Sequence, residues 1–345
     1  MKAVKRILLL ILVVFELSSC LITDNVSSLK VEILRPGIFN MPDSVNRVAI
    51  FINRDIRKPD TCVFKFSKGM NIFSDSILNY KSVSSRCTDA LTSYLKDEAY
   101  FGNVSNYSDS LRFISEKKRI YNDPDYLLKE TNSDVGIFLT YFLFENAFLN
   151  TDNNSFYTQA ALSWVLVFEN DTVYYTYKHN DTLVFNAPDA PDYKPGKLNV
   201  GKTILDAANY LGNSFGSKII PSWIEVERMY YKSSDPEMRR AIKYAQNNDW
   251  LHAAEIWNKE TKNKKRLIAA KATYNMALAC EMEGKPDAGI DWLVKSYSVL
   301  NANNEDHKAN CKRYINILAT RKKEIKLLER QVRPIPNPEN SPVLQ

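Results

Sequence analysis

The sequence predicts an α+β protein in which an N-terminal α/β sandwich domain is followed by a C-terminal α-helical domain. Short apolar segments of strand length recur through the first two thirds of the chain, whereas the last third carries amphipathic helical patterns and an internal repeat. The composition is that of a globular protein, because 45% of the 345 residues are hydrophobic and 25% are charged. This length is enough for two domains with their own cores, without disulfide support.

The first twenty residues have the order of a bacterial export signal. Three basic residues precede an unbroken apolar run from Ile7 to Phe15. Nine apolar residues are too few to cross a bilayer as a mature helix, but they suit the core of a signal peptide. We therefore expect residues 1–19 to be a signal peptide.

The apolar run leads into the segment 17–20, LSSC, which resembles the bacterial lipobox letter for letter. The resemblance implies a lipoprotein that is anchored in membrane lipid by acyl chains on Cys20, since two or more chains hold a protein in a membrane essentially permanently. Residues 20–28 are then a lipidated tether. Leu21 follows the cysteine, which favours the outer membrane of the cell envelope, and no acidic run follows to suggest surface export, so we expect the protein to face the periplasm. The alternative is a secreted soluble protein with a coincidental cysteine.

Residues 29–227 are expected to form the α/β domain. Strands are predicted at 29–34, 48–52, near Val104, and at 135–144, 160–168, 173–178 and 183–185, with helices at 89–100, 126–130 and 200–219. The run 135–144, VGIFLTYFLF, is nearly continuous in apolar residues, which suits a central strand. The last three strands predict a meander with turns at 169–171 and 179–181, whose Asn and Asp side chains favour turns.

Residues 228–333 are expected to form an all-helical domain with an internal repeat. Six positions recur 36 residues later: Ala241, Tyr244, Asn248, Trp250, Ala253 and Trp257 are followed by Ala277, Cys280, Gly284, Pro286, Gly289 and Leu293. The pattern resembles the helical hairpins of TPR (tetratricopeptide) repeats, with Gly284 in the inter-helix turn. Two repeats are fewer than the three that normally stand alone, so we expect a capping helix at 307–332. Residues 334–345 are a proline-rich tail.

The two domains differ in charge. The whole chain has a formal net charge of +6, and residues 228–333 alone hold 22 Lys and Arg against 13 Asp and Glu. A basic helical domain favours an anionic partner, unless these side chains are simply solvated helix faces such as the segment 262–266, KNKKR. Nucleic acid is not an expected partner outside the cytoplasm. Only three histidines and no CxxC spacing occur, so we expect no metal and no cofactor.

Four cysteines follow Cys20 in the chain. Cys62 and Cys87 fall in the first domain and Cys280 and Cys311 in the second, so one disulfide in each is the simplest of three connectivities in an oxidising envelope. Cys280 and Cys311 also lie on apolar helix faces, which leaves buried free thiols as the alternative.

The segment 196–203, GKLNVGKT, fits the phosphate-binding pattern GxxxxGK[ST] and precedes a predicted helix. A P-loop also needs a buried strand directly before its first glycine, so that backbone N–H groups can surround the phosphates. The preceding residues 186–195, NAPDAPDYKP, contain three prolines instead. We therefore predict a loop that leads into a helix, and no nucleotide binding.

The segment 212–216, GNSFG, fits the GxSxG pattern of serine hydrolases, with Ser214 at the position of the nucleophile. A nucleophile elbow joins a strand to a helix, whereas Ser214 falls late in an amphipathic helix, and His252 and His307 follow only in the helical domain. We therefore predict small residues that let the helix pack closely, and no catalytic residue. An envelope hydrolase acting on glycan, lipid or peptide is the alternative function.

Five Asp-[Ser/Thr]-aliphatic triplets occur in the first domain. They resemble the O-glycosylation acceptor of the Bacteroidetes envelope, and the residues concerned are Ser44, Ser76, Ser110, Thr172 and Thr182. Ordinary turn chemistry is the alternative explanation, because Asp and Ser favour turns.

Several segments together resemble an uncharacterised Bacteroidetes lipoprotein family that joins an α/β domain to TPR-like helices. They are the lipobox, the segments 34–37 (LRPG), 47–50 (RVAI), 219–223 (IIPSW) and 228–231 (RMYY), and the repeated Trp250 and Trp257. The resemblance implies the fold and the envelope location, and it supplies no catalytic residues. From the helical repeat we expect a non-enzymatic module that binds an envelope protein or peptide, because stacked helical hairpins present extended concave surfaces.

Overall fold

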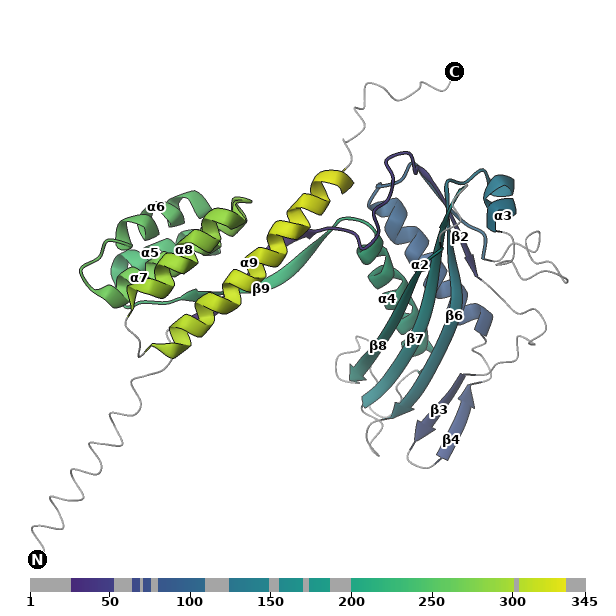
Figure 1. The fold of residues 1–345 in the computed structure, drawn as a ribbon. Helices are drawn as coiled ribbons and strands as arrows, with labels where there is room; N and C mark the ends of the chain where they lie inside the picture. The colour runs from purple at the N-terminus through teal and green to yellow at the C-terminus, as the bar shows by residue number, and fades with distance from the viewer. Residues whose placement is uncertain are drawn as a thin grey trace, which may run out of the picture. The chain divides into compact units, whose positions relative to one another are not determined.

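The computed structural model describes residues 26–52, 64–68, 71–75, 80–108, 124–148, 155–169, 174–186, 200–300 and 304–332. These residues divide into two compact units. The α/β unit comprises residues 36–222 and 330–332, and the helical unit comprises residues 26–35 and 223–329. The first unit is built on a sheet and the second on helices (Figure 1), which confirms the predicted α+β class of an α/β sandwich followed by TPR-like helices.

The α/β unit contains a seven-stranded mixed sheet (Figure 1). Its strands are β2 (Arg47–Ile52), β3 (Phe64–Lys68), β4 (Asn71–Asp75), β5 (Asn103–Asn106), β6 (Val135–Phe148), β7 (Ser155–Phe168) and β8 (Tyr174–Asn186). β2 pairs in parallel with β5 and with the first part of β6, and β6, β7 and β8 form an antiparallel meander. Ile50 lies opposite Ile137, which lies opposite Leu166. β6 is therefore the central strand that its apolar sequence predicts.

Helices pack on both faces of this sheet. They are α2 (Tyr80–Asp97), α3 (Pro124–Thr131) and α4 (Val200–Ile219). α2 and α4 share one core with the sheet, in which Trp164 of β7 stacks on Phe215 of α4 with 4.5 Å between the ring centroids. α3 packs in a second core with Phe51 and Phe138. Successive strand side chains point to opposite faces, so β2 supplies Ile50 to the first core and Phe51 to the second.

The prediction of two strands separated by a turn at 179–181 was wrong. β8 is one continuous strand of 13 residues, in which Asn180 lies opposite Ala161 of β7. A full-length partner strand supplies a backbone hydrogen-bond ladder, and this outweighs the turn preference of Asn and Asp. The alternation of the strand then buries His179 and leaves Asn180 exposed. The hairpin of β3 and β4 was not predicted.

The helical unit contains two helical hairpins and a long last helix. Its helices are α5 (Pro236–Gln246), α6 (Trp250–Glu260), α7 (Arg266–Met282), α8 (Pro286–Val299) and α9 (Glu305–Gln331). The two inter-helix turns are equivalent, because Asn248 and Gly284 both have positive φ, at 62° and 68°. Ala253 and Gly289, also 36 residues apart, are both buried. The predicted repeat is thus confirmed, and α9 follows where the capping helix was predicted.

A two-stranded ribbon, β1 (Val26–Arg35) with β9 (Ser222–Tyr231), completes the helical unit. Val31 and Ile33 are buried with Tyr230 and Tyr231 in the core of the helices. The predicted boundaries, which assigned residues 29–227 to the α/β domain, differ from this division. The physical reason is that two hairpins expose apolar surface that a third repeat would otherwise cover, and the ribbon covers it here. Of the helices described, none is long and apolar enough to cross a membrane.

Candidate functional site

The inner face of the helical unit, formed by α5, α7 and α9, is occupied by the ribbon. One core contains Met238, Ala241 and Ile242 of α5, Tyr274 and Leu278 of α7, Tyr314 and Leu318 of α9, and Val31, Ile33, Tyr230 and Tyr231 of the ribbon. α7 is consequently buried at nearly every position from Ala269 to Glu281. Stacked helical hairpins offer such a surface to partners. In this protein it already holds two extended strands of the same chain.

Asn275 of α7 holds the backbone of β9 at Tyr231. The Tyr231 N–H donates to Asn275 Oδ1 at 2.8 Å, and Asn275 Nδ2 donates to the Tyr231 carbonyl oxygen at 3.0 Å. A side-chain amide carries an acceptor and a donor side by side. It can therefore bond both the N–H and the carbonyl oxygen of one extended residue, as a neighbouring strand would. Lys271 Nζ adds a hydrogen bond to the carbonyl oxygen of Lys232 at 3.2 Å. These contacts recognise the backbone and are independent of its side chains.

Arg228 of β9 and Glu281 of α7 form a buried ion pair. Arg228 Nη2 donates to Glu281 Oε1 at 2.8 Å, and Arg228 Nε donates to Oε2 at 2.9 Å. Tyr314 of α9 donates its hydroxyl to Glu281 Oε2 at 2.7 Å. Burial, followed by the charge of Glu281, raises the pKa of Tyr314 well above its usual value, so its hydroxyl stays protonated and donates. Bidentate pairing of this kind is what a buried charge requires.

Tyr231 also belongs to a second buried network. Its hydroxyl lies 3.1 Å from His307 Nδ1 and accepts from Asn310 Nδ2 at 2.9 Å. His307 Nε2 lies 3.0 Å from Ser296 Oγ, and that hydroxyl donates to the Ala270 carbonyl oxygen at 2.8 Å. Burial is the main cause that lowers the pKa of His307, which keeps the ring neutral near pH 7. Ser296 and His307 are both buried, so this serine–histidine pair fastens the ribbon and is closed to substrate.

Sequence reasoning did not identify these residues as a site. The sequence analysis included Arg228 and Tyr231 only as part of the segment 228–231, one of the segments that resemble the lipoprotein family. The signal that was available lies in α7, where Lys271, Asn275 and Glu281 interrupt a helix that is otherwise rich in alanine and apolar residues. A polar side chain in a helix buried on all sides needs a partner, and each of the three has one from β9 or the residue after it.

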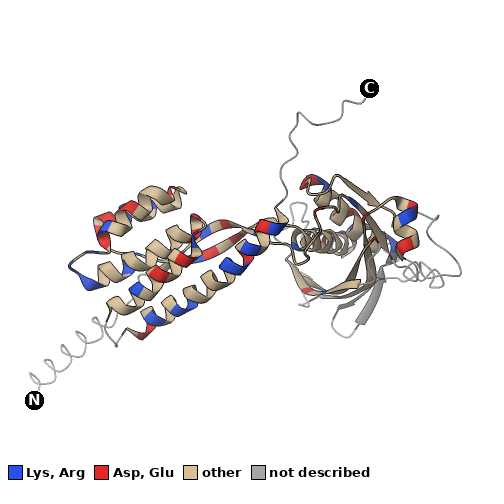
Figure 2. Ribbon diagram, turned by 45° about the horizontal axis from the view of Figure 1, so that its top comes forward, with Lys and Arg blue, Asp and Glu red and all other residues tan. Residues whose placement is uncertain are grey.

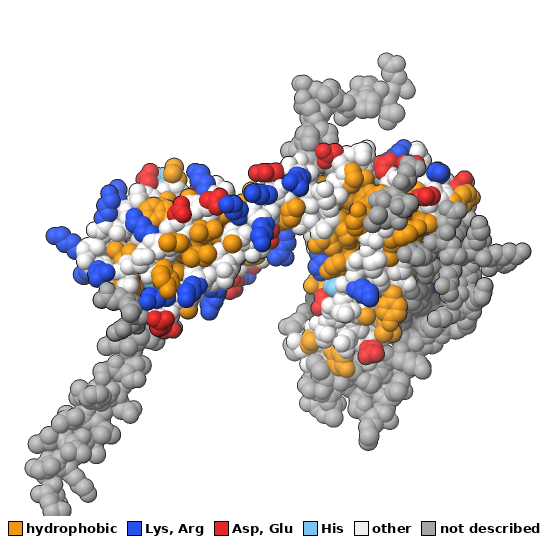
Figure 3. Space-filling model, in the orientation of Figure 1, with side chains coloured by type: hydrophobic (Ala, Val, Ile, Leu, Met, Phe, Trp, Pro, Cys, Tyr) orange, Lys and Arg blue, Asp and Glu red, His pale blue; other side chains and the backbone are white. Residues whose placement is uncertain are grey.

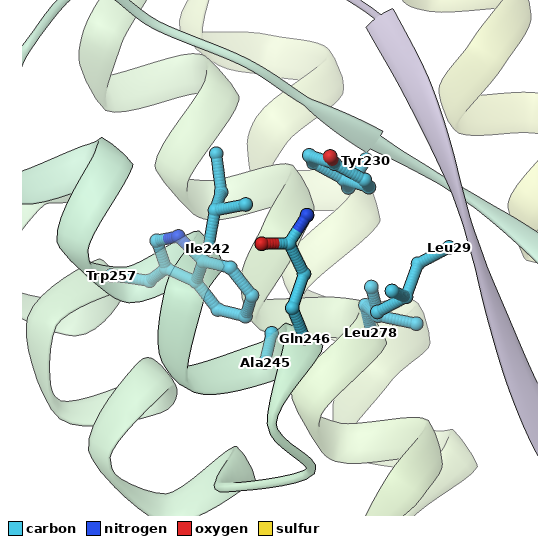
Figure 4. A pocket seen from close by; sticks show the side chains of 7 residues that line it. All are labelled: Leu29, Tyr230, Ile242, Ala245, Gln246, Trp257 and Leu278. Carbon is cyan, nitrogen blue, oxygen red and sulfur yellow. The ribbon is translucent and has the colours of Figure 1, made fainter.

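A small apolar hollow lies between the ribbon, α5, α6 and α7 (Figure 4). It is lined by Leu29, Tyr230, Ile242, Ala245, Gln246, Trp257 and Leu278. No water molecule fits inside it, so it is a gap in side-chain packing. Within the described ranges, no group of three or more His, Cys, Asp or Glu is arranged to hold a metal ion.

In the α/β unit, Lys218 of α4 brings Ser214 and His179 together. Lys218 Nζ donates to Ser214 Oγ at 3.1 Å and lies 3.5 Å from His179 Nε2. That nitrogen lies 3.6 Å from Asp181 Oδ2. Burial, followed by the charge of Lys218, lowers the pKa of His179, although Asp181 acts in the opposite direction. The four side chains form a polar link between α4 and β8 that the sequence did not predict.

The two glycines of the segment 212–216 are packing residues. A Cβ on Gly212 would lie 2.1 Å from the carbonyl oxygen of Cys87, and one on Gly216 would lie 2.5 Å from Tyr94 Cδ1. α2 and α4 therefore approach too closely for larger side chains at these positions. Ser214 lies inside α4, where the backbone N–H groups are used in the hydrogen bonds of the helix. No nucleophile elbow is formed there, because an elbow joins a strand to a helix. This agrees with the predicted close packing.

Many predicted sites lie outside the described residues: Cys20, Cys62, Ser76, Ser110, Thr172 and residues 196–199 of the segment 196–203. The rest of that segment, from Val200, begins α4, where Thr203 is buried. Ser44 and Thr182 are exposed, as a glycosylation acceptor must be.

Cys87, Cys280 and Cys311 are free thiols. Cys280 is directed at Gly289 of α8, whereas Cys311 Sγ lies 3.6 Å from His307 Nε2. The disulfide Cys280–Cys311 is therefore not formed, because the two side chains pack against different neighbours, and the alternative of free thiols holds. Burial raises the pKa of Cys311 to about 11, so it is an unreactive thiol.

Comparison with solved structures finds the PelC dodecamer from Paraburkholderia phytofirmans, in two crystal forms. Their identity to this chain is 8% and their TM-score 0.26; the matches cover 57% and 56% of this chain and 99% and 98% of theirs. A TM-score this low carries no inference about this protein. No match was found among curated proteins.

Two family models match the chain. Residues 239–320, within the helical unit, are similar to the family described as Domain of unknown function (DUF6340). Residues 45–231, which span the α/β unit and reach the end of β9, match a second model. Because this second match extends over more than half of the chain, the chain belongs to the family described as Domain of unknown function (DUF8603).

Proposed function

We propose that this protein is a lipid-anchored lipoprotein of the bacterial cell envelope whose helical unit is a non-enzymatic, protein-binding module. The lipobox-like segment that ends at Cys20 supports the anchor. The occupied inner face is the observation that supports the module most strongly. Asn275 and its neighbours hold an extended strand by its backbone, so these helices have the chemistry to bind polypeptide. Because the chain's own ribbon fills that face, a separate partner binds the outer faces.

The outer faces carry exposed apolar side chains. Leu251 of α6 is 64% exposed and Val294 of α8 is 53% exposed. Figure 3 shows hydrophobic side chains gathered on the face of the helical unit where α8 lies. On the same helix, Lys295 Nζ lies 4.7 Å from the ring centroid of Trp292. Exposed aliphatic side chains beside an aromatic residue suit a protein contact, since aromatic residues are enriched at interfaces. We assign the partner contact to α6 and α8.

A photo-crosslinking amino acid tests this assignment in intact cells. Placed at Leu251 or Val294, it should yield a discrete protein adduct. The matched controls are Tyr126 and Val184, which are 56% and 54% exposed in the α/β unit and should yield none. The substitution Val294→Lys should remove the adduct formed from position 251 without changing the amount of protein. Adducts from the α/β positions alone, or from no position, would contradict the proposal.

A further inference from the structure

The loop between α6 and α7, together with the first residue of α7, carries four cationic side chains in five residues. Lys262, Lys264, Lys265 and Arg266 are all exposed. Figure 2 shows this loop, at the left end of the helical unit, in the blue of Lys and Arg. Within the described part of the chain, none of the four forms a salt bridge. We call residues 262–266 the basic loop. Arg266 Nε donates to the Val299 carbonyl oxygen at 3.2 Å, and the three lysines leave their charge available to an anionic surface.

The charge of the basic loop is placed where it disfavours the following helix. Lys265 is the N-cap residue of α7 and makes no side-chain capping bond, Arg266 follows it, and the first turn contains no acidic residue. Cations at a helix N-terminus oppose the helix dipole. The two preceding helices are capped by Asp235 and Asp249, whereas α8, like α7, follows a lysine, Lys285, that makes no side-chain capping bond. What distinguishes the start of α7 is that cations continue through Arg266 with no acidic residue in the first turn, whereas the first turn of α8 contains Asp287.

The path of β1 brings its first residue toward the same end of the unit. Near the end of β1, the Leu34 carbonyl accepts a hydrogen bond from Arg321 in the second half of α9. Earlier in the strand, Leu29 lines the same hollow as Tyr230, which is close to the end of β9. The residue after β9, Lys232, is bonded to Lys271 in the first half of α7. β1 therefore begins at the end of the unit where α7 begins.

Short distances separate this end from the basic loop and from the proposed anchor. Lys271 follows Arg266 by five residues, which is about 8 Å along a helix axis. Five residues, LITDN, separate Cys20 from Val26, so an extended chain places Cys20 no more than about 20 Å from the start of β1. A lipid-anchored Cys20 sits at the membrane surface, and the end of the helical unit that carries the basic loop is then the end nearest to it.

We infer that the basic loop binds the anionic headgroups of phospholipids in the membrane that holds the anchor. This inference rests on the proposed lipid anchor. Each Lys or Arg close to an anionic surface strengthens binding by about fivefold. The attraction is screened over about 8 Å at physiological ionic strength, so the charges nearest the membrane dominate. Leu267, which is 52% exposed directly after the loop, adds an apolar contact at the interface.

Vesicle co-sedimentation tests the loop without the acyl chains. The mature chain from Leu21 onward is mixed with vesicles of phosphatidylcholine, alone or with about one third phosphatidylglycerol. We expect binding to the anionic vesicles only. The triple variant Lys262→Gln, Lys264→Gln, Lys265→Gln should bind on the order of 100-fold more weakly. The control triple variant Lys285→Gln, Lys323→Gln, Lys326→Gln removes the same charge from exposed positions elsewhere in the helical unit and should bind within about threefold of the unmodified sequence.

Three results would overturn the inference: no binding to anionic vesicles, binding that is independent of lipid charge, or equal losses in the two triple variants. Loop-dependent binding to a soluble polyanion such as polyglutamate, without vesicle binding, would also overturn it and would indicate an acidic protein partner. The anchor is tested separately by the mass of the N-terminal peptide. An unmodified Cys20 with loop-dependent vesicle binding would refute the anchor and leave the lipid preference of the loop standing.

Discussion

Arg228, Glu281 and Tyr314 show at the scale of single residues how the helical unit fixes its ribbon. The Glu281 side chain is fully buried, and the Arg228 side chain is 10% exposed. Removing two charges from water is costly, and only bidentate geometry with further hydrogen bonds offsets that cost. An apolar pair of similar volume would give a similar free energy of unfolding. The main role of the ion pair is therefore to fix the position of β9 on α7.

The first prediction concerns this pair. Glu281→Ala should lower the free energy of unfolding by about 3–5 kcal/mol, because it leaves the Arg228 guanidinium buried without its partner. The double variant Arg228→Met, Glu281→Leu should recover most of this loss. Urea denaturation followed by circular dichroism measures both. A loss below about 1 kcal/mol in the single variant would show that the pair is solvated in solution.

At the scale of elements, α4 and the ribbon mark what the sequence could and could not predict. α4 was predicted with its observed bounds, because apolar residues at helical spacing are a local signal. Its partner α2 was found only in part, since the observed helix begins at Tyr80 and the predicted one at residue 89. The ribbon pairs strands that are almost 200 residues apart, as the contact of Lys30 with Glu225 shows, and no local periodicity reports such a pairing.

The second prediction tests the close approach of α2 and α4. Gly212→Ala should destabilise the α/β unit by about 1–3 kcal/mol, because the new methyl group would meet the backbone of α2. Ser217→Ala, five residues further along the same helix, should change stability by less than about 0.5 kcal/mol. Thermal unfolding compares the two. If the two variants lost the same amount of stability, α2 and α4 would lie further apart in solution than in the structure.

The same helix separates the packing interpretation of Ser214 from the hydrolase alternative. Its contact with Lys218 resembles the activation of a nucleophile, yet Ser214 lacks the exposed position of an elbow. A broad serine-reactive probe should therefore leave the protein unlabelled. Labelling that disappears in Ser214→Ala would reverse this interpretation.

At the scale of the whole molecule, composition and periodicity were enough to predict two units, the helical repeat and its basic charge. They did not predict that the strand at 29–34 belongs to the helices, because its alternating pattern fits a sheet of either unit. That assignment matters for function, because it makes the helical unit the part of the protein that directly follows the proposed tether after Cys20.

The intact mass of the N-terminal peptide of the mature protein, isolated from membranes, tests this account most directly. We predict a peptide that begins at Cys20 and carries the mass of a diacylglycerol thioether with or without a further acyl chain, and we predict that Cys20→Ala releases most of the protein from membranes. An unmodified peptide that begins near Leu21, or one that retains Met1, would contradict the anchor.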